Sequence, residues 1–341
     1  MDRSNASEYV YAKASGMLAK SFIGPRASTL FSVNSLSELW SLLFKSDVPA
    51  IPGELLAKKL EQEAEKRFIT QYVRLVSCFS TPDHILVSLL RFYDFDNLKD
   101  IGASLSLKKE KMPEIADISP YSMLNYDGWP NLEAITARTP LEWYKTAPTV
   151  SDQQKIDAKV DNQYISMIFG SIDELPSGER APVFELIKLR YVLENILWAI
   201  RLKVYYKMEK NDIIPLLAYA GLHKGKMDII AGPAIRILDK SIDSWDEWTS
   251  WKYASMLNPH EEGTIWNLDP RWFELSIRKR VNYEAMKRFH MHPFTALVMV
   301  SWYMIKLNEL HMIRTATEAL RLDADKREAM RFAGVSPAAV R

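Results

Sequence analysis

The sequence has little cysteine and little glycine, and each shortage bears on the fold. Cys78 is the one cysteine, so no disulfide can form within the chain, and we expect a reducing compartment. It lies in the apolar run from Tyr72 to Phe79, where a small buried hydrophobic residue is expected rather than a reactive thiol. Twelve glycines among 341 residues leave few positions for the positive-φ turns of β-hairpins. We therefore expect helices rather than strands.

The chain also lacks an excess of charge of either sign and any long apolar run. With 44 basic and 43 acidic residues, the net charge is +1, which gives no electrostatic footprint for nucleic acid or an anionic membrane surface. The longest charge-free apolar run, Phe294 to Ile305, is shorter than the ~20 residues that cross a bilayer. Residues 1–11 carry Asp2, Arg3 and Glu8 and do not resemble a signal peptide. We expect a soluble protein that reaches a membrane only through a partner.

What the sequence does contain favours helices. Hydrophobic residues make up 48% of the chain, and leucine, alanine, lysine, glutamate and methionine are frequent. Asp325 and Glu328 form a capping box that predicts a last short helix. The predicted fold class is all-α. Apolar periodicity and the positions of proline and glycine predict long helices over residues 6–22, 54–79, 82–101, 152–169, 181–208, 271–289 and 293–320.

Two landmarks recur three times in the same order. The first is a Ser or Thr with Glu three residues later and then Trp, which is a capping box expected to begin a helix. The second is a Pro that precedes an apolar helix bearing an Asn. The first set is Ser35, Glu38 and Trp40; Thr139, Glu142 and Trp143; and Ser244, Glu247 and Trp248. The second set is Pro82 and Asn97; Pro182 and Asn195; and Pro293 and Asn308.

This order predicts an internal repeat of roughly a hundred residues. We expect three similar helical lobes with pseudo-three-fold construction, over residues 1–110, 111–220 and 221–333, followed by a flexible tail over 334–341. An Asn in an apolar helix is costly unless it is hydrogen-bonded. Asn97, Asn195 and Asn308 should therefore share a structural role, such as fixing a helix crossing, at equivalent positions of the lobes.

No set of residues has the spacing of a catalytic, cofactor or metal site. His290 and His292, with His260, Glu261 and Glu262 upstream, form the one metal-site candidate, but His-x-His at a helix end points two ways and lacks an i, i+4 partner. Residues 221–226 contain Gly and Lys without the spacing of a phosphate loop. We predict no catalytic, cofactor-binding or metal-binding residues and no cofactor.

Two further clusters have a structural and a functional interpretation. Trp245, Trp248 and Trp251 lie on one side of a predicted helix and are interpreted as core. The basic run 278–280, which is Arg-Lys-Arg, could dock an acidic partner, but a solvated helix face balanced by Glu274 and Glu284 is favoured.

The repeated pattern resembles the C subunit of the V/A-type ATPases (V-type ATP synthases), a family related to the d subunit of the eukaryotic V-ATPases. In that family, three similar helical segments each carry a Ser/Thr-x-x-Glu-led helix and a later helix with an Asn followed by apolar residues and Arg. The first copy departs from this pattern at Lys99, Asp100 and Gly102. The resemblance extends over residues 8–332 and rests on residues 9–13, on 193–196 with 200–203, and on 306–309 with 313–314.

The resemblance implies a non-catalytic central-stalk adaptor that couples the membrane proteolipid ring to the soluble central shaft of a rotary ATPase, for ATP-linked proton or sodium transport. It would lie at the cytoplasmic face of a membrane, held there by its complex, and would bind no nucleic acid. No catalytic residues carry over from the family. Two alternatives remain open: a soluble helical-repeat scaffold for unrelated protein partners, and a metal-dependent helical enzyme that uses His290 and His292.

Overall fold

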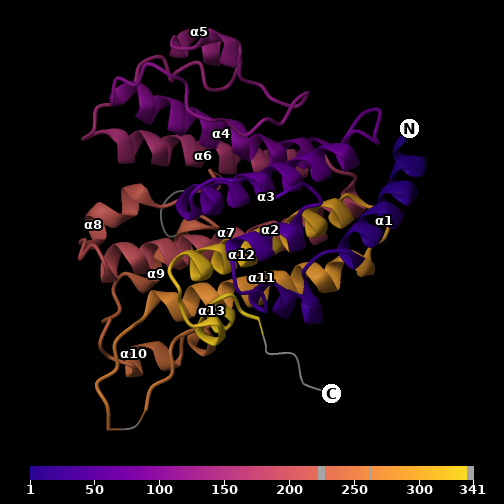
Figure 1. Ribbon diagram of the computed structural model, residues 1–341. Helices are drawn as coiled ribbons and strands as arrows, with labels where there is room; N and C mark the ends of the chain where they lie inside the picture. The colour runs from indigo at the N-terminus through magenta and orange to yellow at the C-terminus, as the bar shows by residue number, and fades with distance from the viewer. Residues whose placement is uncertain (222–226, 262, 336–341) are drawn as a thin grey trace. The chain divides into compact units, whose positions relative to one another are not determined.

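The computed structural model describes residues 1–221, 227–261 and 263–335. Within these ranges every regular element is an α-helix or a 3₁₀-helix (Figure 1), which confirms the all-α prediction. The rejected phosphate loop at 222–226, Glu262 and most of the expected tail lie outside the described residues.

The chain divides into two compact units that do not follow the order of the sequence. Unit 1 combines residues 1–82 with 278–341, and unit 2 consists of residues 83–277. The predicted three-lobe boundaries and the internal repeat are not tested by this division and stay predictions.

Unit 1 is organised on two long helices. Helix α3 packs along α12, and α12 also contacts α1, α2, η1 and α13 (Figure 1). Their facing surfaces are aromatic: the rings of Phe68 and Tyr72 lie 5.1–6.2 Å from those of Trp302 and Tyr303. Such pairs contribute about 0.5–1.5 kcal/mol each beyond the area they bury. The elements are α1 (Arg3–Ala19), η1 (Gly24–Phe31), α2 (Leu36–Leu43), α3 (Gly53–Val76), the later part of α11 (Pro270–Met291), α12 (Ala296–Arg321) and α13 (Lys326–Phe332).

Cys78 follows the end of α3 and is half-buried rather than buried. Its thiol donates to the carbonyl of Arg74, with Sγ and O 3.3 Å apart. The thiol is therefore held against the helix end that precedes it.

Unit 2 contains two helix pairs, α4 with α6 and α7 with α9. Helices α6 and α7 also contact each other. Gly102 of α4 lets Tyr144 approach closely, because a Cβ there would lie 1.9 Å from the tyrosine hydroxyl. The elements are α4 (His84–Ser106), η2 (Tyr126–Gly128), α5 (Leu132–Thr136), α6 (Gln153–Asp173), α7 (Ser177–Val204), α8 (Lys210–Ile213), η3 (Ile214–Leu216), α9 (Ala231–Ile237), α10 (Asp246–Thr249), η5 (Ala254–Met256) and the start of α11.

The capping boxes at the two ends of unit 1 form as predicted. Ser35 Oγ accepts from the N–H of Glu38 at 3.1 Å, and the Glu38 carboxylate accepts from Asn34 N at 2.7 Å. The cap bond also forms at the start of α13, where Asp325 Oδ1 accepts from the N–H of Glu328 at 2.8 Å. Each bond satisfies a backbone donor that has no partner inside the helix.

The box at Thr139 does not begin a helix, so that prediction was wrong. Thr139 Oγ1 accepts from the N–H of Leu141 at 3.0 Å, but the segment continues as turns. The turns bury Leu141 and Tyr144 almost completely, which shows that tertiary burial outweighs the local helix signal here.

The third box gives a helix of one turn. Helix α10 spans Asp246–Thr249, and no side chain caps it. Trp248 of this turn is 1% exposed, and its ring meets those of Trp251 and Trp266 at 5.2 and 6.5 Å. Trp248 is therefore core, as interpreted from the sequence, whereas Trp245 and Trp251 are half-buried members of the same aromatic cluster.

Candidate functional site

Two of the three repeated asparagines hold a downstream segment in the same way. Asn97 Nδ2 donates to the carbonyl of Ala116 and Asn97 Oδ1 accepts from its N–H, both at 2.9 Å. Asn195 binds Ala218 through the same two atoms, at 3.0 and 2.9 Å. We call this two-bond arrangement an asparagine clamp. The side-chain amide thus provides hydrogen-bond partners for the backbone N–H and C=O of the alanine, which is not in a helix and has no helical partners for them.

The clamps correct one part of the prediction. The shared role is structural, but each amide fixes a connecting segment that lies outside the regular helices rather than a crossing between two helices. The sequence placed the asparagines on apolar helices α4 and α7, and it carried no signal for their partners 19 and 23 residues downstream.

A buried carboxylate beside the first clamp was missed by the sequence analysis. Asp94 is 0% exposed and accepts from Ser122 Oγ, Met123 N and Tyr126 Oη at 2.7, 2.8 and 2.7 Å. Burial raises the pKa of Asp94, although the three donors favour its charged form. Burial and the Asp94 charge also raise the pKa of Tyr126. A usable signal was present, since Asp94 and Asn97 lie three residues apart and therefore on the same face of the helix.

A partly apolar recess of unit 2 lies among α4, α6, α7 and the segment around η3. Its volume is about 680 Å³. Phe92, Tyr164 and Leu216 line it, and Val150 and Trp198 leave 80% and 36% of their surface exposed at it. Exposed apolar side chains around a recess of this size are typical of sites that receive another molecule. We call it the unit 2 groove.

Most of the charges in the unit 2 groove are paired with one another, whereas Asp157 accepts a hydrogen bond from Gln153 and has no ion pair among the described residues. Lys99 Nζ lies 3.3 Å from Asp96 and 3.0 Å from Asp161, and Arg190 pairs with Glu194 at 2.8 Å. Burial opposes the charged form of Lys99, but Asp161 and Asp96 outweigh it and raise the pKa of the ammonium. The arrangement therefore suits recognition of a surface more than proton transfer.

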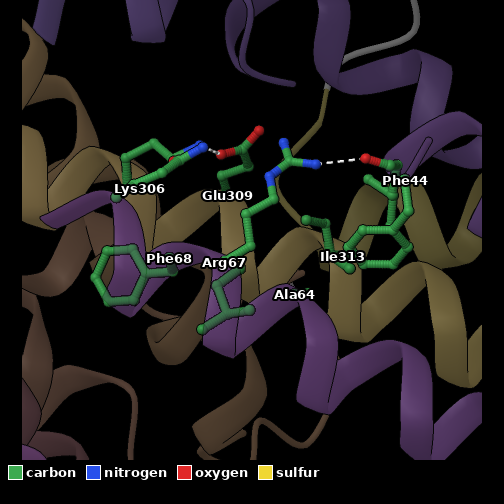
Figure 2. A pocket seen from close by; sticks show the side chains of 10 residues that line it. Phe44, Ala64, Arg67, Phe68, Lys306, Glu309 and Ile313 are labelled. Atoms are coloured by element: carbon green, nitrogen blue, oxygen red, sulfur yellow. Dashed lines mark hydrogen bonds and ion pairs between the residues drawn. The ribbon is translucent and has the colours of Figure 1, made fainter. Parts of the chain in front are cut away.

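An ion pair is buried in unit 1. Lys306 and Glu309 of α12 contact each other and are 4% and 2% exposed (Figure 2). Lys306 also donates to Ser21 Oγ at 2.9 Å, and Glu309 accepts from the N–H of Phe22 at 2.6 Å. Burial lowers the pKa of Lys306 against the pull of Glu309. Through these bonds the ion pair links α12 to the segment that follows α1.

The cavity beside this ion pair is very small. Figure 2 shows Arg67 of α3 near the pair, and its guanidinium donates to the carbonyl of Leu43 at 2.5 Å. The space left over is about 10 Å³, which is room for one water molecule at most. It is too small for a substrate and belongs to the packing of α2, α3 and α12.

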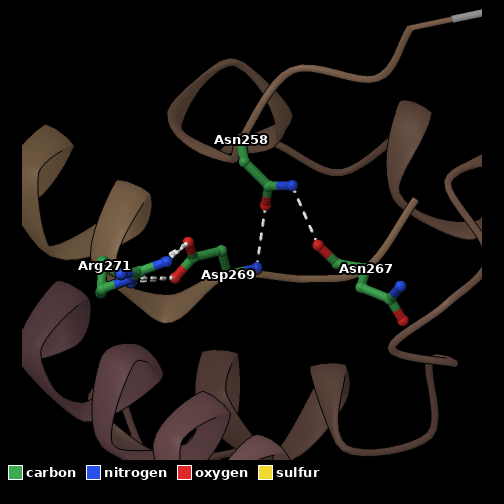
Figure 3. A network of polar contacts seen from close by, with 4 residues as sticks. All are labelled: Asn258, Asn267, Asp269 and Arg271. Atoms are coloured by element: carbon green, nitrogen blue, oxygen red, sulfur yellow. Dashed lines mark hydrogen bonds and ion pairs between the residues drawn. The ribbon is translucent and has the colours of Figure 1, made fainter. Parts of the chain in front are cut away.

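A second polar network fixes the loop before α11 (Figure 3). Asn258 Nδ2 donates to the carbonyl of Asn267 and Asn258 Oδ1 accepts from Asp269 N, both at 2.9 Å. Arg271 donates to the Asp269 carboxylate through Nε and Nη2 at 3.1 and 2.8 Å. Although burial favours the neutral acid, the Arg271 contacts lower the pKa of Asp269. All these groups are engaged within the loop, so the network is structural.

The histidines do not assemble into a metal site in the described part of the chain. The Nδ1 of His290 lies 2.9 Å from the hydroxyl of Tyr11. His260 stacks on Trp245 in unit 2, with ring centroids 5.9 Å apart. Among the described residues, no group of three or more His, Cys, Asp or Glu is placed to hold a metal ion. The metal-dependent enzyme hypothesis has no support in this geometry.

The basic run on α11 is only partly balanced by the acids named from the sequence. Arg280 lies 3.6 Å from Glu284, which also contacts Arg288 at 3.4 Å. Glu274 instead pairs with Arg201 at 2.5 Å. Lys279 is exposed, and the described residues give it no ion pair.

None of the described helices combines the length and the apolarity that crossing a bilayer requires.

Comparison with known proteins gives the family. The family model for the ATP synthase (C/AC39) subunit matches residues 10–332. An uncharacterised protein of Treponema pallidum is 26% identical over 334 residues, which is 98% of each chain. The family match covers nearly all of both units, including both asparagine clamps. This chain therefore belongs to the ATP synthase (C/AC39) subunit family, the V/A-type ATPase subunits that the repeated sequence pattern resembles.

Proposed function

We propose that this chain is the non-catalytic central-stalk adaptor of a rotary V/A-type ATPase. It couples the proteolipid ring in the membrane to the soluble central shaft, and so links ATP turnover to proton or sodium transport. The family match over residues 10–332 is the observation that carries the proposal. The protein acts at the cytoplasmic face of the membrane and is held there by its partners.

The internal construction of each unit suits a part that transmits torque. Such a part must deform little under load, and close-packed interiors have low compressibility. In unit 1, α3 and α12 meet through stacked aromatic rings, and in unit 2 two asparagine clamps tie connecting segments to long helices. These contacts reduce the freedom of the connections, which are ordinarily the softest parts of a helical protein.

The unit 2 groove supplies a candidate docking surface for a partner in the complex. Trp198 and Val150 present apolar area, and Lys99 and Arg190 beside them are paired with Asp161 and Glu194. The chain contributes binding surface and requires no cofactor. The alternative, a scaffold for unrelated partners, would use the same groove outside an ATPase.

Deletion of the gene tests the proposal. The catalytic head should still hydrolyse ATP, but it should be recovered in the soluble fraction, and membrane vesicles should lose ATP-driven ion transport. Re-expression of the intact chain should restore both membrane attachment and transport, which controls for effects on neighbouring genes. Transport at the normal rate without this protein would exclude the adaptor role and leave the scaffold alternative.

A further inference from the structure

The third repeated asparagine differs from the other two because, in the part of the chain that the structure describes, no backbone segment occupies its amide. Among the described residues, the contact that Asn308 makes through its amide is a weak one from Nδ2 to Met312 Sδ at 4.0 Å, on the same helix. Asn308 is half-buried on α12. Asn97 and Asn195 use these donor and acceptor atoms to bind Ala116 and Ala218, whereas no described residue binds the Asn308 amide in that way.

Asn308 faces a recess within unit 1. The recess has a volume of about 510 Å³ and lies among η1, α11, α12 and residues 333–335. Elements η1, α12 and α13 contact one another, so its walls are part of the packed unit. Ile23, Met286 and Met312 supply apolar lining. We call it the Asn308 recess.

The polar groups of the Asn308 recess point to a peptide with acidic side chains. Asn282 lines it, and its Oδ1 is buried without a hydrogen-bond partner in the described part of the chain. Arg278 and Lys279 also line the recess, whereas no Asp or Glu does so among the described residues.

We propose that the Asn308 recess binds a non-helical, acidic segment of a partner polypeptide, clamped through its backbone by Asn308. The two filled clamps define the binding mode: one residue of the segment offers both its N–H and its C=O, which is possible only where neither group is used in a helix. Arg278 and Lys279 select acidic side chains beside that residue. The inference rests on the clamp geometry and stands apart from the adaptor role.

The clamps themselves set no charge, because Ala116 is flanked by Glu114 and Asp117 whereas Ala218 is flanked by Leu217 and Tyr219. The preference for an acidic segment comes from Arg278 and Lys279, which line the recess. Residues 336–341, by contrast, contain one charged side chain, Arg341, which has the same sign as the recess. Charge complementarity thus favours an acidic partner over the end of this chain.

A peptide titration of the full-length protein tests the proposal. The probe is a fluorescein-labelled peptide with the sequence of residues 112–118, Met-Pro-Glu-Ile-Ala-Asp-Ile, blocked at its C-terminus. Its binding is followed by fluorescence anisotropy at low salt. The protein should bind this peptide, and a matched peptide with Gln and Asn in place of Glu and Asp should bind about tenfold more weakly.

Variants locate the binding site. Asn308→Ala removes the clamp and Lys279→Glu reverses one charge, and each should weaken binding by about tenfold or more. Arg280→Glu is the matched control, because Arg280 lies on the same helix but does not line the recess, and it should change affinity by less than about twofold. Lys279 is exposed, so its variant keeps the test valid if Asn308→Ala perturbs folding.

Two results would overturn the proposal. One is the absence of peptide binding, or binding that neither Asn308→Ala nor Lys279→Glu weakens. The other is binding that appears only when the chain is cut after Val335, because the occupant would then be residues 336–341 of the same chain and not a partner.

Discussion

Single polar side chains on apolar helices fix the connections of unit 2. Asn97 and Asn195 could be recognised from the sequence as buried groups that need partners, because each interrupts an apolar helix. Their partners could not be predicted, because the asparagines bind backbone groups of Ala116 and Ala218. Which backbone groups come close depends on the path of the connecting segment, and an alanine side chain gives no indication of it. The three donors to Asp94, which are Ser122, Met123 and Tyr126, could not be predicted for the same reason.

Removal of the second clamp should destabilise unit 2. Asn195→Leu keeps a side chain of similar size but leaves the N–H and C=O of Ala218 without these partners. We expect a loss of about 2–4 kcal/mol in the free energy of unfolding, measured with urea. Asn211→Leu, at an exposed site on α8, is the control and should change stability by less than about 0.5 kcal/mol. Equal losses in the two variants would contradict the clamp interpretation.

Gly102 should be intolerant of a side chain. Gly102→Ala places a methyl group 1.9 Å from the Tyr144 hydroxyl, and we expect the variant to lose about 1–3 kcal/mol. Tyr144→Phe should recover part of this loss, because it removes the clashing oxygen, which is buried and has no hydrogen-bond partner among the described residues. Gly170→Ala on α6 meets nothing within 4 Å and should stabilise the protein by about 0.4–1 kcal/mol. Urea unfolding of the variants and of the double variant gives the comparison.

The observed helices show how much of the secondary structure the apolar periodicity of the sequence predicts. Each long predicted helix exists, with ends displaced by a few residues; α7, for example, spans Ser177–Val204 where 181–208 was expected. The capping signal was reliable at Ser35, where a helix with an apolar face follows. It failed at Thr139, where burial of Leu141 and Tyr144 decides the backbone path. A capping box in the sequence thus predicts a helix where the residues that follow it can be buried in a helical conformation.

The ion pair between Lys99 of α4 and Asp161 of α6 should lose its contribution to stability at alkaline pH. The folded-state pKa of Lys99 is raised, so its contribution to stability is fully present below the unfolded value of about 10.5 and is lost as pH rises through the folded value. The difference in unfolding free energy between the wild type and Lys99→Met should stay constant from about pH 8 to 10 and shrink above it. In an Asp96→Asn/Asp161→Asn background the Lys99→Met difference should be smaller throughout. A wild-type advantage that grows above pH 10.5 would contradict the assignment.

The arrangement into two units was beyond the reach of the sequence. The sequence repeat predicts that three consecutive segments have similar structures. It does not predict which segments pack against one another. The units instead record which segments share a core, and unit 1 joins residues 1–82 to 278–341. No periodicity indicates that α3 will meet α12, because their aromatic faces are compatible with many partners. Pairing across such a separation is set by the complete set of surfaces that must be buried.

The discontinuous chain of unit 1 has a consequence for synthesis on the ribosome. Helices α1 to α3 emerge first, but α12, the helix on which they pack, emerges only after residues 83–277 have been translated. At ~5–20 residues per second this delay is roughly 10–40 s, far longer than helices take to form. During that time Phe68 and Tyr72 have no Trp302 to cover them. The newborn N-terminal segment is thus a natural client for a chaperone, while the residues of unit 2 are complete and free to fold first.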